Sequence, residues 1–269
     1  MGTFATSTRG FLCVAASVLI ATSGSSAEGR EPGGTAPEPR TYSSLSPQKG
    51  WASPVADDET FSFFLAELLE YRLSEEGGEG RWDTYGWRGG DYDRVWVKSE
   101  GDVSGGGGQG DVQLVYGRLV SRFFDFQAGV RYEQLWGDGP DPSRVQASVG
   151  FQGLARYFFE AEPTLFVSPE GDVSGRFTGA YDLLLTQRLI LQPRLEAVAA
   201  VQDQEKFGMG PGLNDIDVGL RLRYEFRREF APYVGVNFRQ QYGETARYAR
   251  DDGERTLQWA FVVGARVWF

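Results

Sequence analysis

Apolar residues recur at every second position along the last stretch of the chain, from Thr256 to Phe269. One set of alternate positions is apolar throughout: Leu257, Trp259, Phe261, Val263, Ala265, Val267 and Phe269. The intervening positions include Gln258 and Arg266. Because side chains on a strand point to opposite faces with a period of two, the pattern predicts a β-strand with one continuous apolar face.

Strand-length segments of this kind, separated by turn residues, fill the chain from Phe61 onward. The pattern predicts twelve strands: Phe61–Leu73, Arg81–Arg88, Asp91–Gly101, Gly110–Ser121, Phe123–Trp136, Ser143–Tyr157, Phe159–Ser168, Ser174–Leu189, Leu191–Asp203, Leu213–Arg227, Phe230–Gly243 and Thr256–Phe269. Strands joined directly in chain order are antiparallel, so the expected fold class is all-β, an up-and-down sheet.

The predicted connections alternate in length. Tight turns are expected near Gly89–Gly90, Arg122, Tyr157–Phe159, Ile190 and Arg228–Glu229, and longer loops at Ser74–Gly80, Asp102–Gln109, Gly137–Pro142, Pro169–Val173, Gln204–Asn214 and Glu244–Arg255. Short turns on one side, long loops on the other and an even strand number are typical of bacterial outer-membrane barrels. The arrangement predicts a transmembrane barrel with both termini periplasmic. If Gly89–Gly90 is a bulge and not a turn, the count becomes odd.

The beginning of the chain has the pattern of a secretory signal peptide over residues 1–27. An apolar run, Phe11–Ile20, follows Arg9, and Ser25 and Ala27 have the spacing of a signal-peptidase site. Residues 28–60 are rich in Pro, Gly, Ser and Glu and show no periodicity, which predicts a disordered periplasmic linker. The barrel is expected to occupy residues 61–269, in the bacterial cell outer membrane.

Composition supports a membrane barrel and excludes several functions. Only 41% of residues are hydrophobic, and no apolar run is long enough for a transmembrane helix, so a membrane protein of this composition must cross lipid as a closed barrel. The terminal aromatic strand also resembles the signature by which outer-membrane barrels are recognised for assembly. The formal net charge of −10 makes nucleic-acid binding unfavourable. With no histidine, the usual Ser–His and Asp–His pairs are absent, so we expect no enzyme.

Alternation also predicts which side chains face the lumen. These inward positions carry charges of both signs: Asp125, Arg131, Glu133, Asp182, Arg188, Arg194, Glu196, Asp217, Arg221, Arg223 and Glu225. One interpretation is a network of arginines and carboxylates that fills and stiffens the barrel. The other is a path for ions or solutes lined by the same groups. We favour the network, because twelve strands enclose little space once long arginine side chains enter it.

Several long segments resemble the bacterial copper resistance protein B family. They are WDTYGWRGGDYDRVWVKSEG at Trp82–Gly101, FDFQAGVRYE at Phe124–Glu133, YDLLLTQRLILQPRLE at Tyr181–Glu196, GLNDIDVGLRLRYEFRREFAP at Gly212–Pro232 and the ending GARVWF. The resemblance covers the whole predicted barrel. It implies an outer-membrane protein of copper resistance and copper homeostasis, with copper as its ion. It also implies periplasmic partners such as a multicopper oxidase or a copper chaperone.

The chain departs from that family in its metal ligands. Members are similar in carrying a segment rich in Met and His before the barrel, whereas residues 28–60 here hold no Met, His or Cys. Past Met1, the only methionine is Met209, in a predicted loop, and one thioether cannot form a copper site. The carboxylates Asp91, Asp93 and Glu100 are alternative ligand candidates, but oxygen donors favour harder cations. We favour a structural interpretation, in which Asp91 and Asp93 order the turn and Glu100 pairs with a neighbouring strand.

Two functions remain open from the sequence. The first is a copper-resistance barrel that limits copper by binding or by export at the outer membrane. The second is a barrel of the same fold that has lost copper ligation and serves as a small-solute channel or as a structural outer-membrane protein. The length of the matching segments favours the first, and the missing Met- and His-rich segment favours the second.

Overall fold

The computed structural model describes residues 59–137, 141–251 and 253–269. The predicted signal peptide and nearly all of the predicted linker lie outside these residues. The described part is a single antiparallel sheet with strands β1 Phe61–Ser74, β2 Gly77–Gly89, β3 Asp93–Ser104, β4 Gly107–Ser121, β5 Phe124–Gly137, β6 Ser143–Leu154, β7 Glu160–Val167, β8 Val173–Ala180, β9 Leu183–Leu184, β10 Leu189–Ala200, β11 Gly212–Tyr224, β12 Phe230–Gln241 and β13 Leu257–Trp268.

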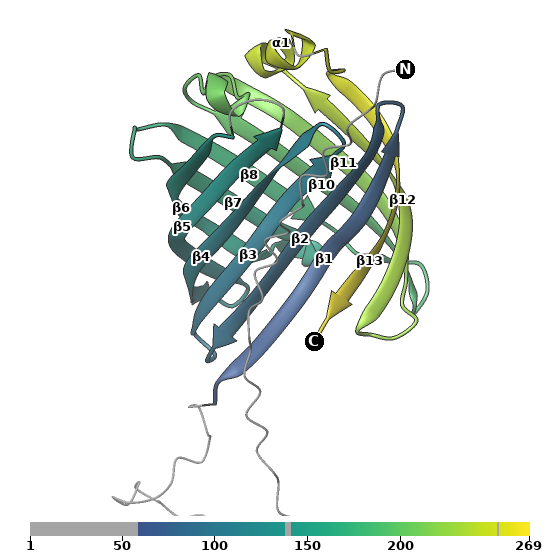
Figure 1. Cartoon of the computed structure of the whole chain (residues 1–269). Helices are drawn as coiled ribbons and strands as arrows, with labels where there is room; N and C mark the ends of the chain where they lie inside the picture. Colours follow the sequence, from purple (N-terminus) through teal and green to yellow (C-terminus); the bar gives the residue numbers. More distant parts are fainter. Residues whose placement is uncertain (1–58, 138–140, 252) are drawn as a thin grey trace, which may run out of the picture. The chain divides into compact units, whose positions relative to one another are not determined.

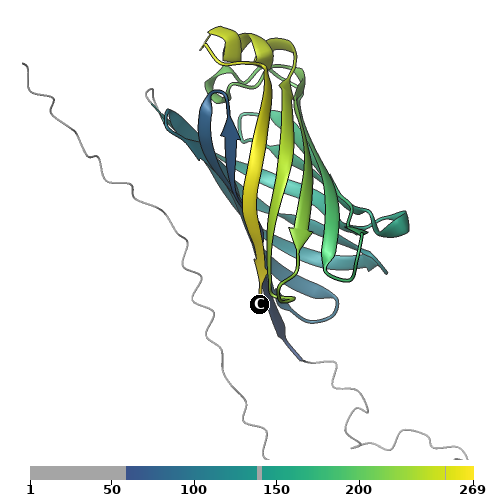
Figure 2. The ribbon, with the colours of Figure 1, turned by 90° about the vertical axis from the view of Figure 1, so that its right-hand side faces the viewer.

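The sheet closes on itself as a barrel of twelve strand crossings. Each strand pairs with its neighbours in chain order, and β13 returns to pair with β1 (Figures 1 and 2). The short β9 pairs with β10 beyond the end of β8, so β8 and β9 are two parts of one crossing. Phe64 and Phe269 exchange two backbone hydrogen bonds of 2.9 and 3.0 Å, which close the ring at the rim where β1 begins. The predicted strand number and barrel class are confirmed.

Two predicted long loops are wrong. β1 and β2 are joined by Glu75–Glu76 alone, and β3 and β4 by Gly105–Gly106 alone. Gly77 and Gly107 follow these turns with φ of 129° and 152°, a backbone region that strains residues with a Cβ. The glycine-rich segments were predicted as loops because glycine shows no side-chain alternation. Their backbones nevertheless continue the hydrogen-bonded ladder of each hairpin.

Three further predictions concern the turns at the opposite rim, where β1 begins. The predicted turn at Gly89–Gly90 is confirmed, since β2 ends there and the Gly90 amide donates to the Asp93 carbonyl at 3.0 Å. The predicted turn at Ile190 is wrong, because Ile190 lies within β10. The chain turns at residues 185–188 instead, where the Thr186 hydroxyl accepts hydrogen bonds from the amides of Arg188 and Leu189. The predicted strand Ser143–Tyr157 ends earlier, at Leu154, and the short 3-10 helix η1 (Arg156–Phe158) follows.

The two faces of the wall have the predicted character. In β11, Val218, Leu220 and Leu222 are exposed on the outside, whereas Asp217, Arg221 and Arg223 are buried inside. The same alternation runs through β13, where Trp259, Phe261 and Val263 are exposed. An apolar outer band and a polar interior are what a barrel in lipid requires, because the outer surface then meets hydrocarbon.

One rim of the barrel carries additional structure. The connection from β10 to β11 holds the 3-10 helix η2 (Glu205–Phe207), and the connection from β12 to β13 holds the α-helix α1 (Gly243–Asp251). Figure 1 shows α1 above this rim. Ala246 and Ala249 of α1 are buried. Among the described residues no helix is long and apolar enough to cross a membrane.

Candidate functional site

A β-bulge in β1 alters which side chains point into the barrel. Ala66 and Leu68 lie opposite consecutive residues of β2, so Glu67 is an extra residue between them. Glu67 points inward, with its carboxylate 3.5 Å from Arg194. Leu68 also faces inward, where it forms a small buried apolar cluster with Tyr233 and Val262. The bulge therefore adds one carboxylate to the lumen.

The most deeply buried ion pair joins β1 to β11. Arg221 donates to both carboxylate oxygens of Glu70 at 2.9 Å, and the two side chains are 1% and 0% exposed. Glu70 also accepts hydrogen bonds from Arg72 at 2.8 Å and from the Tyr233 hydroxyl at 3.1 Å. Arg72 in turn contacts Asp217 at 2.9 Å. A buried carboxylate with this many donors is fixed in position.

A second group of charges crosses the middle of the barrel. We call it the septum and define it as Arg81, Glu100, Arg176, Arg194 and Glu196. Its members come from β2 and β3 on one wall and from β8 and β10 on the other. Because β2 and β8 are six places apart in the ring of twelve crossings, these walls face each other.

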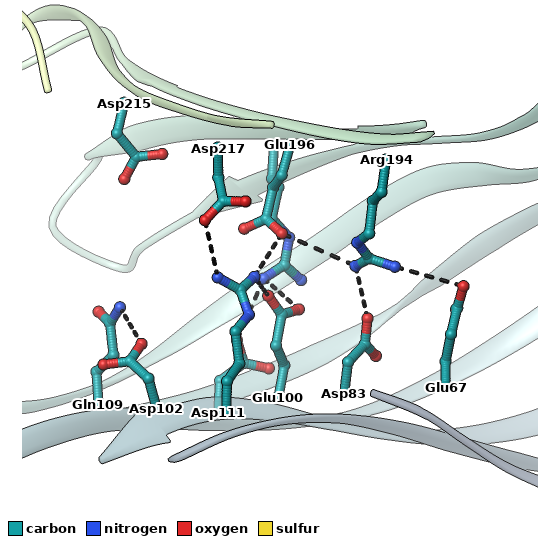
Figure 3. A network of polar contacts seen from close by, with 12 residues as sticks. Glu67, Asp83, Glu100, Asp102, Gln109, Asp111, Arg194, Glu196, Asp215 and Asp217 are labelled. Atoms are coloured by element: carbon teal, nitrogen blue, oxygen red, sulfur yellow. Dashed lines mark hydrogen bonds and ion pairs between the residues drawn. The ribbon is translucent and has the colours of Figure 1, made fainter. Parts of the chain in front are cut away.

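Short ion pairs connect the two walls through the septum. Arg81 lies 2.6 Å from Glu196, and Arg176 lies 2.7 Å from Glu100. Arg81 also contacts Glu100 at 3.4 Å, so the pairs are linked to one another. Arg194 lies 2.7 Å from Asp83 on the facing strand β2 (Figure 3). Opposite walls of the barrel are thus in direct contact through side chains.

The same network continues toward β5 and β6. Asp111 lies 2.8 Å from Arg131 and 3.6 Å from Arg176, and Arg131 also contacts Glu133 at 2.8 Å. Phe166 is an inward aromatic residue in this region, with the Arg131 guanidinium 4.3 Å from the centre of its ring. Stacking and ion pairing together restrict the position of Arg131.

Two cavities lie in series along the barrel. The α1 cavity, about 240 Å³, is on the side of α1 and η2. The terminal cavity, about 220 Å³, is on the side where β1 begins and β13 ends. Glu100 and Arg176 line both cavities, so the septum lies between them. Beyond these two shared residues, Arg81 and Glu196 line the α1 cavity and Arg194 the terminal cavity.

Acidic groups outnumber basic groups around each cavity. The charged lining of the α1 cavity is Glu100, Asp102, Asp111, Glu133, Glu196, Asp215, Asp217 and Glu254 against Arg81, Arg131, Arg176 and Arg239. The charged lining of the terminal cavity is Glu67, Asp83, Glu100, Glu160 and Glu162 against Lys98, Arg176 and Arg194. Cavities of this charge concentrate cations relative to anions.

The α1 cavity is covered at the rim. Thr245 of α1 accepts hydrogen bonds from the Gly210 amide at 2.9 Å and from Asn214 Nδ2 at 2.7 Å, which ties the helix to the chain entering β11. The Tyr248 hydroxyl donates to Asp203 at 2.8 Å, and this hydrogen bond raises the pKa of Tyr248. α1 is therefore anchored to the neighbouring connection on both sides.

The structure does not bring the candidate metal ligands together. Asp91 is exposed in the turn between β2 and β3, and Asp93 begins β3, where its carboxylate accepts a hydrogen bond from Tyr116. Glu100 lies seven residues further along β3 in the septum, about 23 Å away at 3.3 Å per residue. Met209 lies beside the α1 cavity, but its sulfur is 3.5 Å from an Arg144 nitrogen. Within the described ranges no group of three or more His, Cys, Asp or Glu could hold a metal ion.

Most residues of the predicted lumen network lie inside the barrel. Asp125 contacts Arg94 at 3.2 Å and Asp182 contacts Arg223 at 2.6 Å, both away from the septum. Arg188 lies exposed in the turn before β10, and Glu225 follows the end of β11. Neither residue belongs to the central network.

Sequence reasoning missed several central members of the network. Arg81 is the first residue of one predicted strand, and Arg72 lies near the end of another. The residues next to them in the sequence therefore gave no indication that they belong to the lumen network. Both arginines are buried inside the barrel, as is Glu70. The alternation of inward and outward positions, followed along the whole of β1 and β2, was the pattern that could have identified these residues.

Comparison with known proteins decides the family. The family model described as "Copper resistance protein B precursor (CopB)" matches residues 60–269. The chain belongs to the copper resistance protein B family. It is 48% identical over 206 residues to "Copper resistance protein B" of Escherichia coli, covering 76% of this chain and 68% of that protein. It is 40% identical over 216 residues to the "Copper resistance protein B homolog" of Pseudomonas syringae pv. tomato, covering 80% and 72%.

Two of the solved structures with a similar course of the chain are porins. The NanC porin has a TM-score of 0.49 at 11% identity, covering 77% of this chain and 99% of that one. The KdgM porin has a TM-score of 0.44 at 11% identity, covering 77% and 98%. As a closed barrel with an apolar outer band, this copper resistance protein B family member is an outer-membrane protein with lipid around it.

Proposed function

We propose that this protein contributes to copper resistance by letting copper cations, as cargo, pass across the outer membrane through the barrel. The observation that carries the proposal is the pair of cavities in series, each with more carboxylates than basic groups. Family membership supplies the ion, and the acidic lining supplies a reason for a cation to enter.

The donor atoms inside the barrel favour passage over storage. Tight copper sites use thioether, thiolate or imidazole ligands, and the barrel region contains one methionine and neither cysteine nor histidine. The thioether of Met209 lies next to the Arg144 guanidinium, whose positive charge repels a metal ion. Carboxylates of the septum are already paired with arginines. A cation in these cavities would be held weakly and released readily.

The orientation belongs to the same proposal. The two longest connections, which hold η2 and α1, lie at one rim together with the tight turns Glu75–Glu76 and Gly105–Gly106, whereas all connections at the rim where β1 begins and β13 ends are short. In bacterial barrels the longer loops are external. The terminal cavity then opens toward the periplasm, where a multicopper oxidase or copper chaperone would meet it. We retain residues 1–27 as signal peptide and 28–60 as linker in this proposal.

Copper tolerance and copper binding test the proposal together. Expression in a copper-sensitive bacterium that lacks its own family member should restore growth on copper and lower periplasmic copper. Titration of the full-length refolded protein in detergent with Cu(I) and with Cu(II) should give no tight stoichiometric site, for wild type and for Met209→Leu alike. Restored tolerance with tight stoichiometric binding would show storage in place of passage.

A second candidate is a small-solute channel or structural barrel without a copper role. It is favoured by the sequence of residues 28–60, which lacks Met, His and Cys. In that case expression leaves copper tolerance unchanged, and copper does not induce the gene. The lack of histidine likewise supports a function other than catalysis for either candidate.

A further inference from the structure

The ion pairs inside the barrel reach different distances across the ring of strands. Glu70 and Arg221 join two strands on the same side of the ring, since β11 and β1 are three places apart. The septum ion pairs, in contrast, join strands five places apart, close to the maximum of six in a ring of twelve. A layer of side chains that reaches between nearly opposite walls can block the axis.

The septum also lies between the two cavities. Glu100 and Arg176, which form a 2.7 Å pair, are the only residues that line both the α1 cavity and the terminal cavity in the part of the barrel that the structure describes. The side chains of Arg176 and Glu100 are 11% and 15% exposed, so little solvent reaches either one.

Each septum arginine is held by more than one partner. Arg176 contacts Glu100 and, at 3.6 Å, Asp111, and Arg194 contacts Asp83 and, at 3.8 Å, Glu196. Charge-assisted pairs in a poorly hydrated interior resist thermal displacement, because a freed arginine would leave a buried carboxylate unpaired. The septum therefore forms a partition that opens only when one of these pairs breaks.

We propose that the septum is the permeability barrier of the barrel, and that Glu100 and Arg176 are the pair that keeps the two cavities apart. With the septum in place the barrel is sealed, and cations that enter either cavity stop there. Passage requires the Arg176 side chain to leave Glu100. The proposal rests on the proposed function only for the identity of the cargo.

Shortening the central pair should open the barrel. In Glu100→Ala/Arg176→Ala both charges of the pair are removed together, while Arg81 keeps Glu196 and Asp111 keeps Arg131 as partners. Full-length protein is reconstituted into planar lipid bilayers in KCl. Wild type should give little current, and the double variant should give stepwise openings with at least about tenfold more conductance. K⁺ should be carried in preference to Cl⁻, because both cavities are acidic.

The matched control is Asp215→Ala/Arg239→Ala. This pair, 3.1 Å apart, also lines the α1 cavity but lies outside the septum, so its removal enlarges that cavity without joining it to the other. Its conductance should stay at the wild-type level. If Glu100→Ala/Arg176→Ala does not fold, Glu100→Ser/Arg176→Ser shortens the same pair while keeping polar side chains there.

Three results overturn the proposal. They are a steady wild-type conductance equal to that of the septum variants, an equal gain in the control variant, and septum variants that fold yet stay closed. None of them bears on copper tolerance, because the current is carried by K⁺ and Cl⁻. Failure of the copper experiment is therefore distinguishable from failure of the septum experiment.

Discussion

The pair between Glu70 and Arg221 should be the most costly single ion pair to break. In Arg221→Met a flexible apolar side chain fills much of the space, but Glu70 loses two hydrogen bonds of 2.9 Å. Removing one partner of a buried pair costs about 3–5 kcal/mol. Arg72 and Tyr233 still donate to Glu70, so we expect a loss near the lower end, about 3 kcal/mol.

Equilibrium unfolding by urea in lipid vesicles, followed by tryptophan fluorescence, measures this loss. Arg255→Met is the control, because Arg255 and its partner Glu75 are 62% and 80% exposed. Exposed pairs contribute about 0–1 kcal/mol. The double variant Glu70→Gln/Arg221→Met should recover more than half of the loss, since no carboxylate is then left short of donors. The reasoning is refuted if Arg221→Met is as stable as Arg255→Met, or if the double variant is less stable than Arg221→Met.

Three smaller changes test other parts of the barrel. Leu220→Arg on the outer face near the middle of β11 should lower the free energy of unfolding by about 2–4 kcal/mol in the same assay. Leu257→Arg at the rim should lower it by about 0–1 kcal/mol. Equal losses would contradict the assigned depth of the two residues in the membrane. Tyr233→Phe removes one hydrogen bond to the charged Glu70 and should cost about 1.5 kcal/mol, and a neutral result would show that the hydroxyl adds nothing. Thr245→Val removes the acceptor of two hydrogen bonds that hold α1, from the Gly210 amide and from Asn214 Nδ2. Limited proteolysis should therefore cut the α1 connection several-fold faster than in wild type, with the rest of the barrel intact. An unchanged cleavage rate would mean that Thr245 does not anchor the helix.

Strand phase was predictable from the sequence because the environment on each face is uniform. Lipid surrounds the whole outside and charged groups fill the inside, so Leu220 and Arg221 must face opposite ways whatever their partners are. The same argument predicted the strand number, since every crossing repeats the same pattern. It failed where glycine hides the pattern, as at Gly107 and Gly108, which were predicted as loop but begin β4.

The pairing inside the barrel was not predictable from the sequence. The alternation along each strand indicates that Glu100 and Arg176 both point inward. Their contact, however, depends on two positions that lie 76 residues apart on nearly opposite walls. It also depends on strand stagger and on how neighbouring arginines share the space. The alternative of Glu100 as a metal ligand used proximity to Asp91 along one strand, whereas Glu100 contacts Arg81 on the neighbouring strand β2 and Arg176 across the lumen.

The bulge at Glu67 determines where this barrel tolerates a change in length. In a regular strand such as β11, losing one residue would turn every following side chain to the opposite face, moving arginines into lipid. At Glu67 the extra residue has no place in the pairing with β2, so its deletion would leave Ala66 facing outward and Leu68 facing inward as before. Relatives that differ by one residue within a membrane strand are therefore expected to differ here, at the cost of one carboxylate beside Arg194.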